Sequence, residues 1–332
     1  MTPGIEGLFG MKKWQIKKED RPAFRAGSRA RAMILAAGLT ALPLERPSMA
    51  GENIPQKPFA QSVWLPEATE FVITPWYEYS EFFHVWRGSH RESIEVNPRH
   101  DGHGFDQNDG MVLIDYGLAP GWAADLTFGY TSAASRSFNP SQKVQATQGL
   151  MDTTFGLRYQ AFRESPEDSR WIPTLTFRAG GFYRGKYDSD FPFAPGNGSV
   201  GIEPSFLVNK GFGWDGFGAY GHSGFRWVRS GGNDQWFGAV GLFQNINNFT
   251  LNVGYRHFAN TAGEDIGGSG TTFAYSRFIK EIKEEIQGGV GYTTPKRHNH
   301  YQFYLGKVVD GRNTGAALTF GLYADFRFGF PK

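Results

Sequence analysis

Charged side chains recur at alternate positions of apolar, extended segments, and they are the residues of this chain most able to act on a solute. They carry both signs: Glu78, Asp115, Asp125, Asp152, Arg158, Arg178, Arg256 and Arg327. If the segments pair into a closed wall, these candidate pore-lining side chains share its inner face, where charged rings control which solutes pass. The same residues could instead pair with one another and fill a narrow lumen. Both alternatives stay open.

Three local motifs that could serve catalysis or ligand binding have simpler explanations. Residues 211–216 fit the G-x-G-x-x-G spacing, but strand-like alternation resumes at once, so they predict a hairpin turn. His222 and Ser223 are neighbours in an extended segment and point to opposite faces, although His222 with Ser205 stays open as a pair. The His- and Asp-rich segment 89–110 lacks calcium-loop spacing and predicts a solvated outer loop. We therefore predict no catalytic, cofactor-binding or metal-binding residue, no cofactor and no enzymatic activity.

The elements that would position the charges are strands with a two-residue period. Trp122, Leu126 and Tyr130 share one face of a strand, while Asp125 and Thr131 share the other. The same alternation runs through residues 112–118, 151–160, 173–180 and 249–256. One face carries large aromatic residues and the other carries Gly, Asp, Arg, Gln and Asn. This alternation is typical of the strands of a transmembrane barrel.

Composition removes the main alternatives to a barrel. The 332 residues include 44 glycines, 16% aromatic residues and no cysteine. No apolar stretch reaches the roughly 18–20 residues that a spanning helix needs, which excludes a polytopic helical membrane protein. The missing cysteines exclude disulfide scaffolds and thiol catalysis. A closed barrel is then the remaining way for this chain to span a membrane.

The spacing of turns gives the strand number. Short links at residues 119–121, 212–214 and 244–248 alternate with longer ones near 87–108, 133–148, 186–199 and 261–270. About thirteen segments are strand-like, whereas single-chain bacterial barrels use even numbers. The least regular segments are 199–211 and 270–294, where residues 280–285 could also form a helix or turn. We predict an all-β fold, a transmembrane antiparallel up-and-down β-barrel of about 12 strands.

The first fifty residues have the layout of an export signal. They hold nine basic and four acidic residues, followed by an apolar run at 32–44 and small residues before Gly51. We predict an export signal at 1–50, with Met11 as a plausible true start, a periplasmic segment at 51–67 and the barrel at 68–332. An amphipathic helix is the alternative for 1–50. The rest of the chain holds 25 basic and 28 acidic residues, which gives no support for a nucleic-acid partner.

The last strand predicts the cellular location and the partners. Apolar residues alternate up to an aromatic one: Leu322, Ala324, Phe326, Phe328 and Phe330. This pattern resembles the terminal signal by which outer-membrane barrels are recognised for assembly. We therefore expect the outer membrane of a Gram-negative bacterium. The expected partners are outer-membrane lipid and lipopolysaccharide, the assembly machinery through the C-terminal strand and a small-molecule solute.

Four segments carry a family resemblance over residues 68–330. They are Tyr77-Glu78-Tyr79-Ser80, Asp115-Tyr116-Gly117-Leu118, residues 149–159 and Arg312-Asn313-Thr314-Gly315. With them the chain resembles the outer-membrane barrels grouped under the meta-pathway of phenol degradation. The resemblance implies an exported barrel that admits small aromatic or hydrophobic compounds, and it brings no catalytic residues. The predicted function is a channel or transporter, with a plugged structural or surface-binding barrel and a lipid-modifying membrane enzyme as alternatives.

Overall fold

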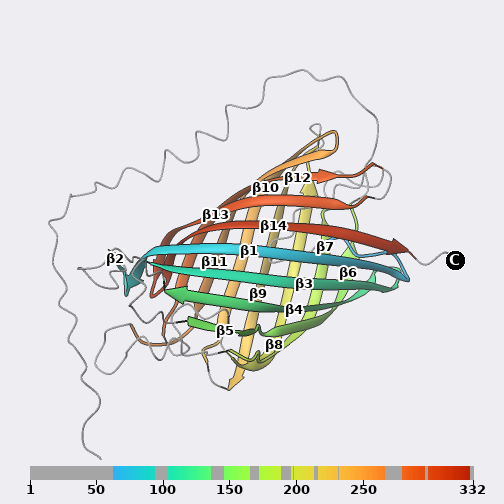
Figure 1. The fold of residues 1–332 in the computed structure, drawn as a ribbon. Coiled ribbons are helices and arrows are strands. Elements are labelled where there is room, and N and C mark those ends of the chain that lie inside the picture. The colour runs from blue at the N-terminus through green and yellow to red at the C-terminus, as the bar shows by residue number, and fades with distance from the viewer. Residues whose placement is uncertain are drawn as a thin grey trace, which may run out of the picture. The chain divides into compact units, whose positions relative to one another are not determined.

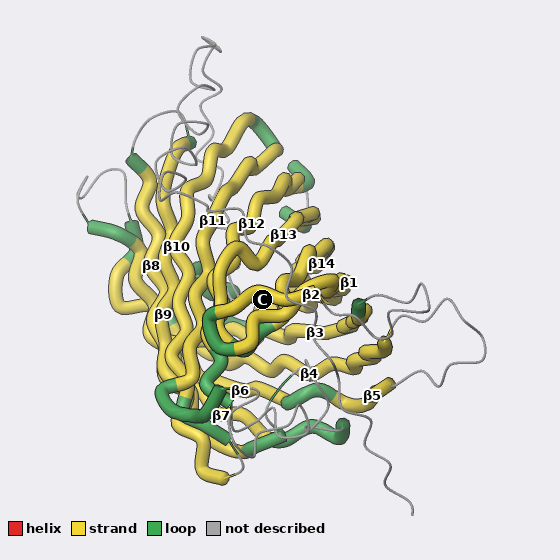
Figure 2. The backbone as a smooth tube through the Cα atoms, turned by 90° about the vertical axis from the view of Figure 1, so that its left-hand side faces the viewer, coloured by secondary structure: helices red, strands yellow, loops and turns green. Residues whose placement is uncertain are grey.

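The computed structural model describes most of the chain after the predicted signal. The described residues are 63–93, 104–135, 146–164, 172–187, 196, 198–212, 216–230, 232–265, 279–295 and 298–329. The predicted signal, its cleavage site before Gly51, the alternative start at Met11 and Phe330 lie outside them. Figure 2 shows the described residues as strand or loop. Among them, no helix is long and apolar enough to cross a membrane.

Fourteen strands make up one antiparallel sheet (Figure 1). They are β1 Glu70–Arg87, β2 His90–Ser93, β3 Phe105–Ala119, β4 Trp122–Ser135, β5 Ala146–Leu150, β6 Thr153–Phe162, β7 Thr174–Tyr183, β8 Val200–Gly211, β9 Phe217–Ser230, β10 Gln235–Ile246, β11 Phe249–Asn260, β12 Ile282–Thr293, β13 His300–Arg312 and β14 Gly315–Gly329.

The sheet closes on itself because β14 pairs with β1. Their register runs from Glu70 opposite Gly329 to Val85 opposite Gly315. Both β5 and β6 pair with β4, so together they occupy one position in the wall. The short β2 extends β1 as a hairpin outside this circuit. The wall therefore has twelve strand positions, which confirms the predicted antiparallel barrel of about twelve strands.

Side-chain burial follows the predicted alternation of faces. Trp122, Leu126 and Tyr130 are 39%, 38% and 49% exposed, whereas Asp125 and Thr131 are 4% and 0% exposed. A soluble sandwich would show the opposite arrangement, because its large apolar side chains would be covered. Along β4 the large apolar residues face outward and Asp125 faces the lumen, as a bilayer-spanning barrel requires.

Two segments differ from the sequence prediction. Residues 105–110 belong to β3 rather than to an outer loop, and Asp106 lies opposite Glu81. From Ile282 onward the segment with helical character is the strand β12, paired with both β11 and β13. Hydrogen bonds on both edges of β12 stabilise its extended backbone and outweigh the local helix propensity.

Inward-facing aromatic rings pack against glycines of neighbouring strands. A Cβ atom added at Gly241 or at Gly254 would come within 2.3 Å of Tyr220. A Cβ atom at Gly321 would lie 2.0 Å from Cζ of Tyr304. Glycine is thus required at these positions because the rings occupy the space of a side chain. This packing lets large residues fit inside a barrel of this size.

Candidate functional site

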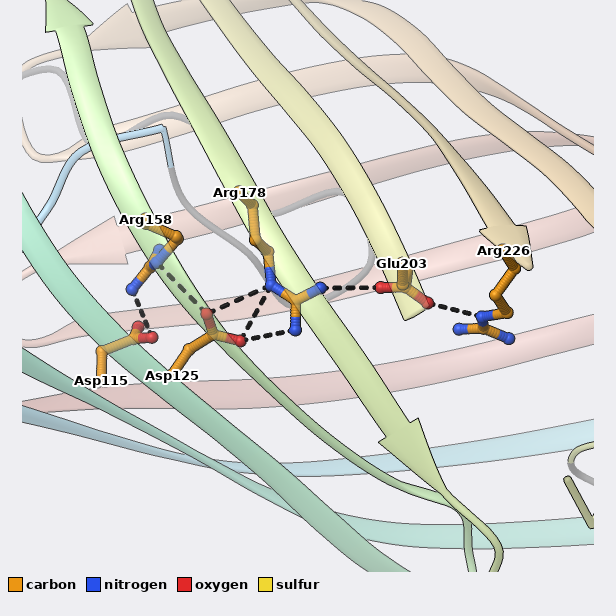
Figure 3. A network of polar contacts seen from close by, with 6 residues as sticks. All are labelled: Asp115, Asp125, Arg158, Arg178, Glu203 and Arg226. Atoms are coloured by element: carbon orange, nitrogen blue, oxygen red, sulfur yellow. Dashed lines mark hydrogen bonds and ion pairs between the residues drawn. The ribbon is translucent and has the colours of Figure 1, made fainter. Parts of the chain in front are cut away.

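Six charged side chains of alternating sign cross half of the inner wall (Figure 3). We call this set the charged ladder: Asp115, Arg158, Asp125, Arg178, Glu203 and Arg226. They come from β3, β6, β4, β7, β8 and β9 in that order. Each neighbouring pair is an ion pair, with closest N···O distances of 2.5, 3.7, 2.8, 2.9 and 2.5 Å along the ladder.

The register explains why the ladder needs its middle carboxylate. Arg158 and Arg178 lie directly opposite each other on β6 and β7, which is unfavourable for two like charges. Asp125 contacts both guanidinium groups, and Arg178 donates to its two carboxylate oxygens from Nε and Nη2. Gly156 and Gly180 make room for this arrangement, since a Cβ atom on either would lie within 2.8 Å of the Arg178 guanidinium.

The ladder is shielded from water except at one end. The side chains of Arg158, Asp125 and Arg178 are 0% exposed, whereas that of Arg226 is 31% exposed. Buried ion pairs are favourable only when both partners stay engaged, because an isolated buried charge is strongly destabilising. The ladder therefore acts as one rigid unit of the wall that presents a cation to the lumen.

The adjoining part of the wall, formed by β13, β14, β1 and β3, carries an aromatic cluster. Its buried members are Trp76, Leu113, Tyr304 and Tyr323. Nε1 of Trp76 donates to the Tyr304 hydroxyl at 2.7 Å, and that hydroxyl donates to Glu78 at 2.6 Å. The cluster fixes Glu78 by a chain of hydrogen bonds, so this carboxylate has a defined place on the inner face.

The eight predicted pore-lining residues fall into separate groups. Asp115, Asp125, Arg158 and Arg178 meet in the charged ladder. Glu78 lies beside the aromatic cluster, and Arg256 pairs with Glu285 at 3.7 Å. Asp152 contacts the β7–β8 loop, and Arg327 lies 3.7 Å from Glu70 where β14 and β1 meet.

Sequence reasoning missed several inner-face residues, namely Glu203, Arg226, Glu285 and Tyr304. Glu203 and Glu285 lie in the two segments with the least regular alternation. Arg226 follows the buried His222 by four residues, so the two-residue period places both side chains on one face.

Asp152 holds part of the β7–β8 loop against the wall. Its Oδ1 accepts hydrogen bonds from the Gly185 amide at 2.7 Å and from the Tyr187 hydroxyl at 2.9 Å. The Gly198 amide donates to the same hydroxyl at 2.8 Å. Burial, together with the Asp152 carboxylate, raises the pKa of Tyr187, so its hydroxyl stays protonated and keeps donating. The loop is thereby anchored at two points.

The segment before β1 folds into the barrel mouth. The carbonyl oxygen of Val63 accepts hydrogen bonds from Thr176 at 2.6 Å and from Gln160 at 3.2 Å. Thr176 is fully buried on the inner face, and Val63 is 3% exposed. Arg163 lies over the Trp64 ring at 5.3 Å. This end of the lumen is therefore narrowed by the chain itself.

At the other end of the barrel, Gly88, Asp265, Arg312 and Asn313 join three loops by hydrogen bonds, and we call this set the loop clamp. Asp265 accepts hydrogen bonds from Arg312 at 2.8 and 2.6 Å and from Asn313 at 2.8 Å. The Gly88 amide donates to Asn313 at 2.7 Å. Asn313 has a φ of 51°, a left-handed conformation that asparagine tolerates well. This explains Arg312-Asn313-Thr314-Gly315, one of the segments that carries the family resemblance, in structural terms.

The catalytic alternative gains no support from the geometry. Ser223 points outward, where its Oγ accepts from Nε1 of the exposed Trp236 at 3.2 Å, while His222 is buried. Ser205 is buried on the inner face, and its Oγ has no hydrogen-bond partner in the part of the chain that the structure describes. Phe212 and Phe217 close a turn by a backbone hydrogen bond, as predicted for residues 211–216. Among the described residues no cluster of three or more His, Asp or Glu side chains could hold a metal ion.

Solved structures agree with this architecture. An outer membrane channel from Pseudomonas putida F1 superimposes with a TM-score of 0.61 at 11% identity, over 84% of this chain and 98% of the channel. The fold is that of an outer-membrane β-barrel. The translocator domain of the autotransporter NalP from Neisseria meningitidis covers 80% of this chain and 90% of its own, with a TM-score of 0.41 at 11% identity. The NanC porin gives 0.40 at 13% identity, over 77% of this chain and 98% of the porin.

Sequence comparison adds no relative. No protein-family model matches the chain, and no curated protein matches it. The resemblance to the meta-pathway barrels therefore stays a prediction.

Proposed function

We propose that this chain is exported to the outer membrane of a Gram-negative bacterium, where it acts as a channel for small solutes. The observation that carries the proposal is a closed barrel whose outer face is apolar and whose inner face is lined with ordered charges of both signs. Such a lining supplies the local field that selects solutes in a pore. The outer face would contact lipid and lipopolysaccharide, and β14 would be recognised by the assembly machinery.

We propose aromatic or hydrophobic compounds as the solute class. Two observations support it: the resemblance to the meta-pathway barrels and the aromatic cluster on the inner wall. Trp76 and Tyr304 pack with their rings at 77° to each other and their centroids 6.1 Å apart, an edge-to-face arrangement.

The plugged barrel is the second candidate, and a specific observation favours it. The middle of the charged ladder is fully buried, and Val63 is hydrogen-bonded inside the mouth. A lumen filled by side chains and by the segment before β1 would pass no solute. The barrel would then serve as a structural or surface-binding protein.

Solute flux into proteoliposomes separates the two candidates. The mature protein is reconstituted, and its folding is checked by the faster migration of unboiled samples on a gel. Entry of phenol, benzoate and a sugar of similar size is then compared with protein-free vesicles. The channel proposal predicts faster entry of at least the aromatic solutes. Folded protein with no increase for any solute supports the plugged barrel.

A further inference from the structure

The charged ladder ends in a cation that faces the lumen. The Arg226 side chain is 31% exposed, while its partner Glu203 is 6% exposed. At the other end, the Asp115 side chain is 3% exposed and pairs with Arg158. The three carboxylates and three guanidinium groups balance, but a solute in the lumen meets the positive end alone. A balanced ladder thus still offers an attractive site to an anion.

The guanidinium of Arg226 is held in a fixed orientation. Its Nε donates to Oε2 of Glu203, and its Cζ lies 5.2 Å from the ring centroid of Phe182 and 5.9 Å from that of Phe237. Both rings are buried, at 3% and 5% exposure. The rings and the carboxylate constrain one side of the group, which lowers the entropy lost when a ligand binds the other side.

The remaining edge of the guanidinium is available to a ligand. Nη1 has a long contact of 3.4 Å to Oε1 of Gln235, and among the described residues Nη2 has no hydrogen-bond partner. Two parallel N–H groups on one edge match the two oxygens of a carboxylate. A neutral amide at 3.4 Å is a weak competitor for such a ligand.

We propose that Arg226 binds the carboxylate of small organic anions inside the lumen. The proposal rests on the proposed channel function and refines its solute class from aromatic compounds in general to those that carry a carboxylate. One negative charge suits the site better than two, because Glu203 lies directly behind the guanidinium and would repel the second charge. Arg178 already engages the other oxygen of Glu203 and cannot turn toward the ligand.

Equilibrium binding tests the site without requiring conduction. The probe is para-fluorobenzoate, observed by fluorine NMR with the full mature protein in detergent, and para-fluorobenzyl alcohol is its uncharged control. Arg226→Gln should weaken benzoate binding by about tenfold or more, the loss expected for a charge-assisted contact. Arg91→Gln removes the same charge from an exposed position in β2 and should leave binding unchanged.

A second variant covers the case in which Arg226→Gln does not fold. Gln235→Glu keeps the charged ladder intact and places a competing carboxylate next to Nη1, so it should also weaken benzoate binding. The proposal is overturned if folded Arg226→Gln, or folded Gln235→Glu when the first does not fold, binds benzoate as tightly as the unaltered protein. Equal binding of the alcohol and the acid overturns it as well.

Conductance measurements distinguish a failure of the Arg226 site from a failure of the channel proposal. In planar bilayers under a potassium chloride gradient, the unaltered protein should favour chloride more than Arg226→Gln does. A folded protein that carries no current refutes the channel proposal. In that case benzoate binding still tests the proposed site at Arg226. A conducting protein whose variants bind benzoate normally refutes the site and leaves the channel standing.

Discussion

Removing Arg178 should destabilise the barrel far more than removing an exposed arginine with similar contacts. Arg178 makes three hydrogen bonds to Asp125, at 2.8–3.1 Å, and one to Glu203 at 2.9 Å. Arg312 makes two to Asp265, at 2.6 and 2.8 Å. The difference is burial, because the side chains of Arg178 and Asp125 are 0% exposed and those of Arg312 and Asp265 are 38% and 39% exposed.

The two environments predict different free energies of unfolding. Arg178→Met removes the cation that Asp125 and Glu203 share and leaves the charged ladder with three carboxylates for two guanidinium groups. Breaking buried pairs in this way costs about 3–5 kcal/mol. Arg312→Met should cost about 0–1 kcal/mol, since an exposed pair is weak and screened by salt. Urea unfolding in detergent, followed by tryptophan fluorescence and by gel migration, measures both values.

A double variant checks the reason for the difference. Asp125→Asn in the Arg178→Met background removes the excess negative charge of the ladder and should recover part of the lost stability. Added salt should change the Arg178 result little, because water does not reach the pair. Equal costs for Arg178→Met and Arg312→Met would refute the reasoning, since burial would then have no effect.

Three further changes test other parts of the structure. Gly321→Ala places a methyl group 2.0 Å from Cζ of Tyr304 and should cost about 1–3 kcal/mol in urea unfolding, while Gly329→Ala, with no atom within 4 Å, should cost almost nothing. Leu126→Arg on the outer face should destabilise the protein in lipid vesicles by about 2–4 kcal/mol, and a negligible cost would show that this face does not meet lipid. Hydrogen bonds in the loop clamp lower the pKa of Asp265, so its contribution to stability is complete above the ordinary value of 3.8 and is lost as the pH falls through the lowered pKa. Asp265→Asn should remove this contribution, so the thermal midpoint of the variant should fall less at low pH. An unchanged dependence of the midpoint on pH would contradict the role given to Asp265.

The two-residue period was enough to predict the barrel and its faces. Along β4, Trp122 and Tyr130 point outward and Asp125 points inward, as the sequence alone indicates. The same period assigned His222 and Ser223 to opposite faces. These are local properties of a strand, so they do not depend on knowing which strand lies next to which.

The charged ladder could not be predicted because it depends on register. Asp115 lies opposite Asp125, and Arg158 lies opposite Arg178. These like-charge pairings would be repulsive without the ion pairs that link the carboxylates to the guanidinium groups. Gly156 is one of many glycines in the sequence, and its role appears once Asp125 is known to lie opposite it. The register between two strands depends on how all strands pair around the closed wall. It therefore cannot be predicted from any single segment.

The inward fold of Val63 was equally hidden. Its contact to Thr176 uses a backbone carbonyl, which carries no residue-specific signal. The sequence predicted a periplasmic segment at 51–67 but gave no reason for its end to enter the mouth. The consequence is functional, since Val63 lies inside the mouth of the lumen that the proposed solute would cross.

Single-channel recording of the unaltered mature protein in planar lipid bilayers tests the central claim most directly. Folding is first verified by the shift between boiled and unboiled samples. We expect discrete current steps after insertion, together with a preference for anions over cations that depends on Arg226. Folded, inserted barrels that produce no current at any applied voltage would contradict the channel and leave a plugged barrel in its place.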